Sequence, residues 1–208
     1  VYNERQKCNM PFYFPEFYYP DKSNNYENIH DTIWSYIIKE FIDNVNRTGI
    51  AIMGQTADLA PADRLMYALR DVTGTVENMS LIASSIMSKK IAAGADAIVL
   101  DVTCGSGAFM KNENDAEALA KKMVSIGKAA GLNTTAVITD MNEPLGRNIG
   151  NSLEVIEAVK FLKGHGEPDL NEVCRTIAGQ MLLAGGMAAD DKDAADKVDE
   201  SIRSGKAL

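Results

Sequence analysis

The chain has 208 residues, 46% of them apolar, and a formal charge of −8. This length and composition suit a globular protein with one substantial core. The negative charge leaves no basic stripe to neutralise phosphates, which argues against a nucleic-acid-binding protein. No apolar run reaches the roughly 18 residues that a membrane span needs, and the N-terminus does not resemble a signal peptide.

Three cysteines, Cys8, Cys104 and Cys174, have no metal-type spacing. We interpret them as reduced thiols of a cytoplasmic protein, without a structural zinc ion.

Aromatic residues are concentrated near the start of the chain. It has seven tyrosines, six phenylalanines and one tryptophan, and ten of these fourteen residues lie between Tyr2 and Tyr36. We therefore expect a division into an aromatic-rich segment, residues 1–38, and an α/β domain, residues 39–208. The sequence does not say where the aromatic segment comes from, and a partner-binding surface is one possibility.

Beyond this segment, apolar runs alternate with helical patterns. The apolar runs typical of buried strands are Gly49–Met53, Ala97–Val102 and Thr135–Thr139. The helical patterns cover Ser80–Ala93, Asp115–Ala130, Ile149–Leu162, Leu170–Leu183 and Asp190–Ser204. This order predicts an α/β layered sandwich, with a buried parallel or mixed sheet flanked by helices.

A cation, a hydroxyl and a second cation occur at Arg70, Ser85 and Lys89. Ser80 is a candidate N-cap for the helix that carries Ser85 and Lys89, and these two residues are four apart, so they share a helix face. We expect Arg70 to approach from the preceding strand or loop. Two cations and a hydroxyl suit a planar heterocycle with carbonyl oxygens and a ring N–H, such as uracil or thymine. The spacing alone is weak evidence, and by itself it favours solvated lysines on a helix over a base site.

Four blocks of sequence carry a wider resemblance. They are QTADLAPAD (residues 55–63), the stretch from Tyr67 to Lys90, AAGADAIVLDVTCGSGAFM (92–110) and AVITDMNEPLGRNIGNSLEV (136–155). Together they resemble the pyrimidine-nucleoside phosphorylase family, which includes thymidine phosphorylase, from about residue 40 to residue 208.

The resemblance implies that Arg70, Ser85 and Lys89 hold the pyrimidine base and that Tyr67 lies beside it. The implied reaction is the reversible phosphorolysis of uridine or thymidine to free base and sugar 1-phosphate, with Arg70 and Lys89 as catalytic groups. It implies a homodimer in the complete family member, and no organic cofactor.

A cation site is also implied. Glu154 and Glu157 follow a helix start, and their pattern alone predicts exposed carboxylates. In bacterial family members the glutamate matching Glu157 helps to bind a monovalent cation, with backbone carbonyls matching those of Leu145 and Asn148. Oxygen ligands suit a hard cation such as potassium.

The chain departs from the family in several places. The lysine-serine and glycine-rich motifs that bind phosphate do not occur in it, and Thr103 stands where the family has a lysine. We therefore expect residues 1–208 to be the central part of a pyrimidine-nucleoside phosphorylase that is inactive by itself. A non-catalytic remnant or fusion, with a partner-binding aromatic segment, is the alternative.

A more distant alternative is an S-adenosylmethionine-dependent methyltransferase. LDVTCGSGAF (residues 100–109) resembles the first motif of that class, in which a glycine turn admits the cofactor. The Pro-Pro-aromatic motif of the adenine methylases is absent, which argues against this alternative.

Overall fold

The computed structural model describes residues 26–50 and 59–208, with side chains from residue 36 onward. The chain divides into two units, residues 1–58 and 59–208. In the first unit, helix α1 (Tyr26–Thr48) continues through residue 38, where the aromatic-rich segment is predicted to end. The predicted strand Gly49–Met53 lies largely outside the described residues, and Gly49 and Ile50 are not in a strand.

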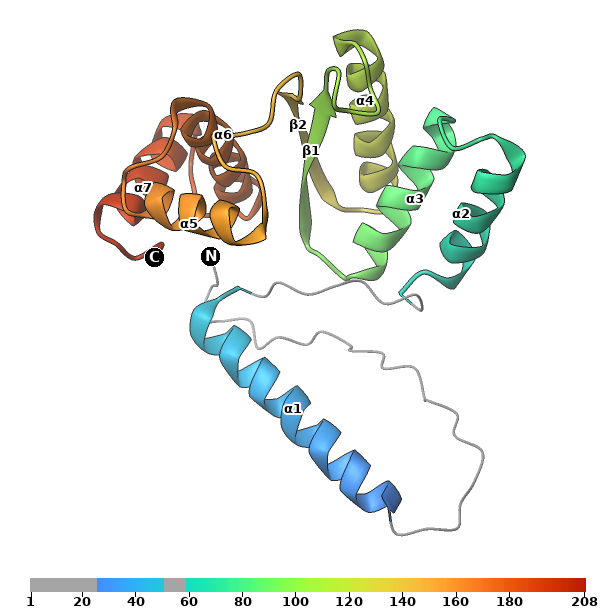
Figure 1. Cartoon of the computed structure of the whole chain (residues 1–208), viewed down its shortest axis with the longest axis horizontal. Helices are drawn as coiled ribbons and strands as arrows, with labels where there is room; N and C mark the ends of the chain where they lie inside the picture. Colours follow the sequence, from blue (N-terminus) through green and yellow to red (C-terminus); the bar gives the residue numbers. More distant parts are fainter. Residues whose placement is uncertain (1–25, 51–58) are drawn as a thin grey trace. The chain divides into compact units, whose positions relative to one another are not determined.

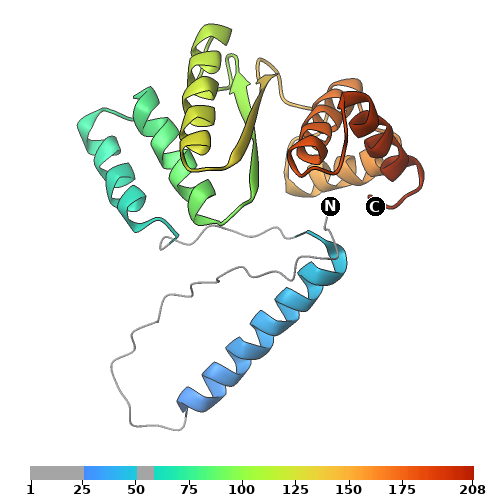
Figure 2. The ribbon, with the colours of Figure 1, turned by 180° about the vertical axis from the view of Figure 1, so that it is seen from behind.

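The second unit alternates helices and strands, as the sequence predicts. Its elements are α2 (Pro61–Thr73), α3 (Met79–Ala92), β1 (Ala97–Cys104), α4 (Glu113–Ala129), β2 (Asn133–Asp140), α5 (Asn151–Leu162), α6 (Pro168–Ala184) and α7 (Asp191–Arg203). The strands pair in parallel, from Ala97 opposite Asn133 to Cys104 opposite Asp140. Figures 1 and 2 show α2, α3 and α4 to one side of the strands and α5, α6 and α7 to the other. The predicted α/β class is confirmed.

The core lies between β1 and helices α3 and α4. Alternate residues of β1 are buried, and they pack with apolar residues of both helices, among them Met87 and Met123. The other face of β1 is less covered, and Asp101 is exposed there. The continuous apolar run predicts that β1 is buried on both faces, but only one face of the strand is fully buried. This difference is consistent with a two-stranded sheet, whose second face contacts α6.

Helix α3 begins one residue before the predicted start. Its N-cap is Asn78, whose side-chain oxygen accepts hydrogen bonds from the backbone N–H groups of Ser80 and Leu81. The prediction that Ser80 caps the helix is wrong, because the asparagine amide already satisfies these first donors. The Ser80 hydroxyl instead accepts a hydrogen bond from Lys122, at 3.2 Å.

Gly127 marks a close approach between α4 and β2. It is buried in the helix, and a Cβ atom at this position would overlap the side chain of Thr134. Thr134 is itself only 4% exposed, so it has little room to move. The absence of a side chain at residue 127 therefore sets how closely α4 packs on the sheet.

We expect Gly127→Ala to lower the free energy of unfolding by about 1–3 kcal/mol, the usual cost of overpacking. This loss outweighs the gain of about 1 kcal/mol that alanine normally brings to a helix interior. Urea denaturation followed by circular dichroism measures the change. Ser125→Ala, at an exposed position of the same helix, is the control and should leave stability unchanged or slightly higher. A stabilising Gly127→Ala would contradict the close approach.

Candidate functional site

The candidate site is built on α2 and α3. Helix α2 starts with Pro61 in its first turn and ends at Gly74, whose φ of 66° is the left-handed conformation that glycine adopts at helix ends. Arg70 therefore lies on a helix, and the expectation of a strand or loop is wrong. Asp63, Tyr67 and Arg70 are spaced four and three apart, so they lie along one face of α2.

Lys89 of α3 reaches toward this face. Its Nζ lies 2.8 Å from Oδ2 of Asp63 and 3.0 Å from Oγ of Ser85. Asp63 and Ser85 are each 5% exposed, whereas the Lys89 side chain retains 28% of its exposure. The structure thus brings Ser85 and Lys89 together as predicted, and it adds a buried carboxylate.

Arg70 and Tyr67 complete the cluster. The Arg70 guanidinium carbon lies 5.2 Å from the centroid of the Tyr67 ring, and Lys89 Nζ lies 5.7 Å from the same centroid. Both distances suit cation–π attraction. The ring remains 49% exposed, while Arg70 is only 6% exposed. All four predicted base-site residues therefore gather in one place.

The hydrogen bonds of Arg70 are incomplete. One terminal N–H group donates to the backbone oxygen of Val76, but the buried Nε has no hydrogen-bond partner among the described residues. A buried donor without an acceptor costs about 1–3 kcal/mol. Nε of Arg70 is therefore a donor in this cluster that these contacts leave without an acceptor.

Asp63 remains ionised despite its burial. Burial by itself would raise the pKa of this carboxyl, but hydrogen bonds from Lys89 and Ser85 and the charges of Lys89 and Arg70 outweigh it, so the pKa lies below its ordinary value. Asp63 is a site residue beyond those predicted from the sequence. Its spacing from Tyr67 and Arg70 is the signal that could have found it.

Glu157 lies against the loop that carries Leu145 and Asn148. Its two oxygens accept hydrogen bonds from the backbone N–H groups of Arg147, at 2.9 Å, and Asn148, at 3.2 Å. A Cβ atom at Gly146 would come within 2.5 Å of Oε2 of Glu157, so the loop can pass this closely only at a glycine. Glu157 is 7% exposed, which corrects the pattern-based expectation of an exposed carboxylate.

These residues fit the chemistry of a hard cation. The backbone hydrogen bond from Arg147 is the main reason why the pKa of Glu157 lies below its ordinary value, and it keeps the carboxylate charged. Two accepted hydrogen bonds leave this carboxylate further lone pairs. No group of three or more His, Cys, Asp or Glu side chains is placed to hold a metal ion within residues 26–50 and 59–208. A cation here would depend on Glu157 and backbone carbonyls, and it stays a prediction.

The glycine turn after β1 is filled by the chain itself. A Cβ atom at Gly105 would lie 2.8 Å from the backbone nitrogen of Asn142, and one at Gly107 would lie 2.8 Å from the Met141 oxygen. The backbone N–H of Ser106 already donates to the Asn142 side chain. The space beside these glycines and the backbone donor of Ser106 are therefore taken up by Met141 and Asn142 of the chain itself. This disfavours a methyltransferase-type cofactor site.

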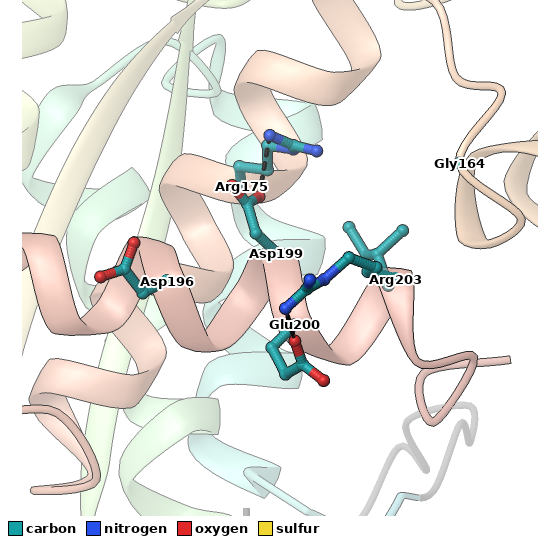
Figure 3. Close-up of a pocket in the computed structure, with 7 residues that line it drawn as sticks. Gly164, Arg175, Asp196, Asp199, Glu200 and Arg203 are labelled. Carbon is teal, nitrogen blue, oxygen red and sulfur yellow. Dashed lines mark hydrogen bonds and ion pairs between the residues drawn. The ribbon is translucent and has the colours of Figure 1, made fainter.

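A hollow beside α7 is lined by charged side chains (Figure 3). Arg175 pairs with Asp199 at 2.8 Å, and Arg203 pairs with Glu200. All four are substantially exposed, so these pairs are of the kind that contributes little to stability. None of the predicted site residues lines this hollow.

Within the described part of the chain, no helix combines the length and apolar character required to cross a bilayer.

Comparison with known proteins identifies the family of the chain. Residues 38–208 match the glycosyl transferase family, a/b domain, and the chain belongs to this family. Among similar proteins, the pyrimidine-nucleoside phosphorylase of Bacillus subtilis is 57% identical over 169 residues, which are 81% of this chain and 39% of that protein. The protein of the same name from Staphylococcus epidermidis is 56% identical over 170 residues, 82% of this chain and 39% of the relative. That from Staphylococcus aureus is 57% identical over 168 residues, with 81% and 39% covered.

The resemblance to pyrimidine-nucleoside phosphorylases is thereby confirmed. The chain spans 39% of the length of these relatives.

The charge on Glu157 should contribute most to the stability of the folded chain at neutral pH. Because its pKa in the folded chain lies below the ordinary value, its contribution to stability is complete above about pH 4.3 and is lost as the pH falls through the lowered value. Glu157→Gln should therefore lower the Tm most near neutral pH, and the difference from the unchanged chain should shrink on acidification. Thermal scans across this range test it.

Glu172→Gln, at an exposed position of α6, is the control for the Glu157 variant and should show no such trend. A difference between Glu157→Gln and the unchanged chain that widens toward low pH would contradict the assigned role of the carboxylate.

Proposed function

We propose that the complete protein catalyses the reversible phosphorolysis of pyrimidine nucleosides, a pentosyl transfer, and that this chain supplies the half of the site that binds the base. The observation that carries the proposal is the convergence of Arg70, Ser85 and Lys89 beside the exposed ring of Tyr67. The relatives named pyrimidine-nucleoside phosphorylases support the reaction class.

The chemistry follows from the cluster. Phosphate attacks C1′ of the sugar, the glycosidic bond breaks, and the base departs with the bonding electrons. Negative charge then develops on the base oxygens. Arg70 presents a planar guanidinium that stays charged, and Lys89 presents a compact ammonium. Donors held in place before the reaction stabilise such charge without having to reorganise.

Ser85 and Tyr67 orient the base in this proposal. The Ser85 hydroxyl can exchange a hydrogen bond with the edge of the ring. The half-exposed Tyr67 ring, with two cations near it, offers a flat surface against which a heterocycle packs.

Phosphate and the cation complete the proposal. The family motifs that bind phosphate do not occur within residues 1–208, so the nucleophile would be held by other parts of the complete protein. A potassium ion would be held by Glu157 with the carbonyls of Leu145 and Asn148. The homodimer is proposed for the complete protein, and a cytoplasmic location remains a prediction that rests on its thiols, of which Cys104 and Cys174 are free.

The first test is base binding by the chain of residues 1–208. We expect uracil to bind weakly, and Arg70→Ala or Lys89→Ala to weaken it by about tenfold or more, because each removes a charged donor worth roughly 1.5–3 kcal/mol. Ligand-observed NMR titration gives the dissociation constants. Lys90→Ala, at the adjacent exposed position, is the control and should bind as the unchanged chain does. Equal loss in all three variants would refute the base site.

The second test separates base binding from turnover. Positioning the nucleophile accounts for up to roughly 7–11 kcal/mol of barrier reduction in a well-oriented reaction. We therefore expect residues 1–208 with uridine and phosphate to release no uracil at enzymatic rates, measured by chromatography. A full-length phosphorylase from the same family is the positive control. Turnover by the chain itself would show that it holds a phosphate site.

In an enzyme that joins this chain to a phosphate site, Arg70→Ala and Lys89→Ala should each lower kcat/KM by on the order of 10² to 10³. This is the usual loss for one donor aimed at developing charge, about 3–4 kcal/mol. Steady-state kinetics with uridine and thymidine measures it, again with Lys90→Ala as the control. Near-normal kcat/KM in both variants would remove these residues from the reaction.

A further inference from the structure

Three successive backbone N–H groups of the loop before α5 donate to carboxylates of two different helices. The N–H of Gly146 donates to Oδ2 of Asp169, in the first turn of α6, at 2.9 Å. The N–H groups of Arg147 and Asn148 donate to the two oxygens of Glu157, on α5, at 2.9 Å and 3.2 Å. Anionic acceptors from α5 and α6 therefore hold this loop together.

The hydrogen bond to Asp169 holds the Leu145 end of the loop. Among the residues that the structure describes, no other hydrogen bond involves residues 143–146. The Leu145 side chain is 45% exposed, so its packing does little to fix this end. Asp169 is thus the principal polar contact that sets the conformation of the chain just before Arg147.

The geometry of the peptide bond converts this contact into an orientation of the Leu145 carbonyl. The N–H of Gly146 and the C=O of Leu145 belong to one planar peptide group. None of the described peptide bonds is cis, so this N–H and this C=O point in opposite directions. When Asp169 accepts the N–H, the Leu145 oxygen is directed away from that carboxylate. A hydrogen bond in a protein also polarises the groups that share it, which makes the carbonyl oxygen a better ligand for a cation.

The same contacts bring negative charge to the loop. Glu157 and Asp169 each contribute a carboxylate, and within the described ranges neither of them forms an ion pair with a basic side chain. The side chain of Arg147, which is 76% exposed, pairs with Glu167 instead, at 3.3 Å. A bound cation would compensate this charge.

We propose that Asp169 is a positioning residue for the cation site, which holds the Leu145 carbonyl in the orientation of a ligand while Glu157 binds the ion directly. This inference rests on the proposed function, which includes a potassium ion held by Glu157 and the carbonyls of Leu145 and Asn148. Groups that hydrogen-bond to the ligands of a metal ion orient those ligands, and their loss weakens metal binding by about 10- to 100-fold. Asp169 acts through the peptide group between Leu145 and Gly146 and need not touch the ion.

The test is potassium binding by the chain of residues 1–208, measured by NMR through the chemical shift of the Leu145 carbonyl carbon. Potassium chloride replaces tetramethylammonium chloride at constant ionic strength, so the general effect of salt cancels. We expect the unchanged chain to bind potassium weakly, and Asp169→Ala to raise the dissociation constant by about tenfold or more. Because Asp169 is exposed, its truncation leaves no buried cavity. Asp191→Ala, the same change at an exposed position in the first turn of α7, is the control and should leave the dissociation constant unchanged.

Asp169→Asn separates the hydrogen bond from the charge. Its amide oxygen can still accept from the N–H of Gly146, so this variant should keep most of the affinity for potassium. If Asp169→Asn binds potassium as weakly as Asp169→Ala does, only the charge matters and the positioning role is overturned. If Asp169→Ala does not fold, as judged by circular dichroism, Asp169→Ser takes its place with the same expected result, because its shorter side chain holds its oxygen one bond further from Gly146.

The outcomes also separate this inference from the proposed base site. A lower Tm of Asp169→Ala with an unchanged dissociation constant for potassium shows a merely structural role and overturns the inference alone. A chain of native fold whose Leu145 carbonyl does not respond to potassium overturns the cation site and the role of Asp169 together. The uracil titration of the same chain tests the base site independently of both results.

Discussion

The ion pair between Asp63 and Lys89 is the contact on which the candidate site depends. Helix α2 buries only two side chains, Asp63 and Arg70, and both are charged. Its apolar residues Leu65, Leu69 and Val72 are largely exposed, so apolar packing does not hold α2 in place within this unit. The position of α2 beside α3 therefore rests mainly on polar contacts, of which this pair and its hydrogen bond to Ser85 are the most buried.

Such an arrangement is poorly explained by stability alone. Desolvating two charges costs about as much as their attraction returns, and replacement of a buried pair by apolar residues is often neutral or favourable. What a buried pair does provide is a defined geometry, because any displacement leaves a charge uncompensated. At this site that geometry sets the distance between Lys89 and Ser85 and the position of Arg70 over Tyr67. The placement of the charged residues is therefore better explained by ligand recognition than by folding.

The sequence predicted the local parts of this structure well. The 3.6-residue period located α3 to α7 to within two residues at every end, and the four-residue spacing placed Ser85 and Lys89 on one face. What it missed depends on contacts between elements. The spacing of Asp63 from Tyr67 and Arg70 places it on their helix face, but its pairing partner is Lys89 of another helix, 2.8 Å away. Glu157 shows an exposed-helix pattern, yet a loop ten residues earlier wraps its carboxylate.

The two halves of the proposed reaction differ in how much of the chain they require. Base recognition needs one helical pair, because every group from Asp63 to Lys89 comes from consecutive elements that contact each other. Phosphorolysis also needs a nucleophile aligned with C1′, and no short stretch can supply that alignment by itself. The incomplete hydrogen bonding of Arg70 and the exposed ring of Tyr67 show that the helical pair does not use all of its polar and aromatic capacity. A base packed on the Tyr67 ring would by mass action stabilise the same contacts that hold α2 against α3.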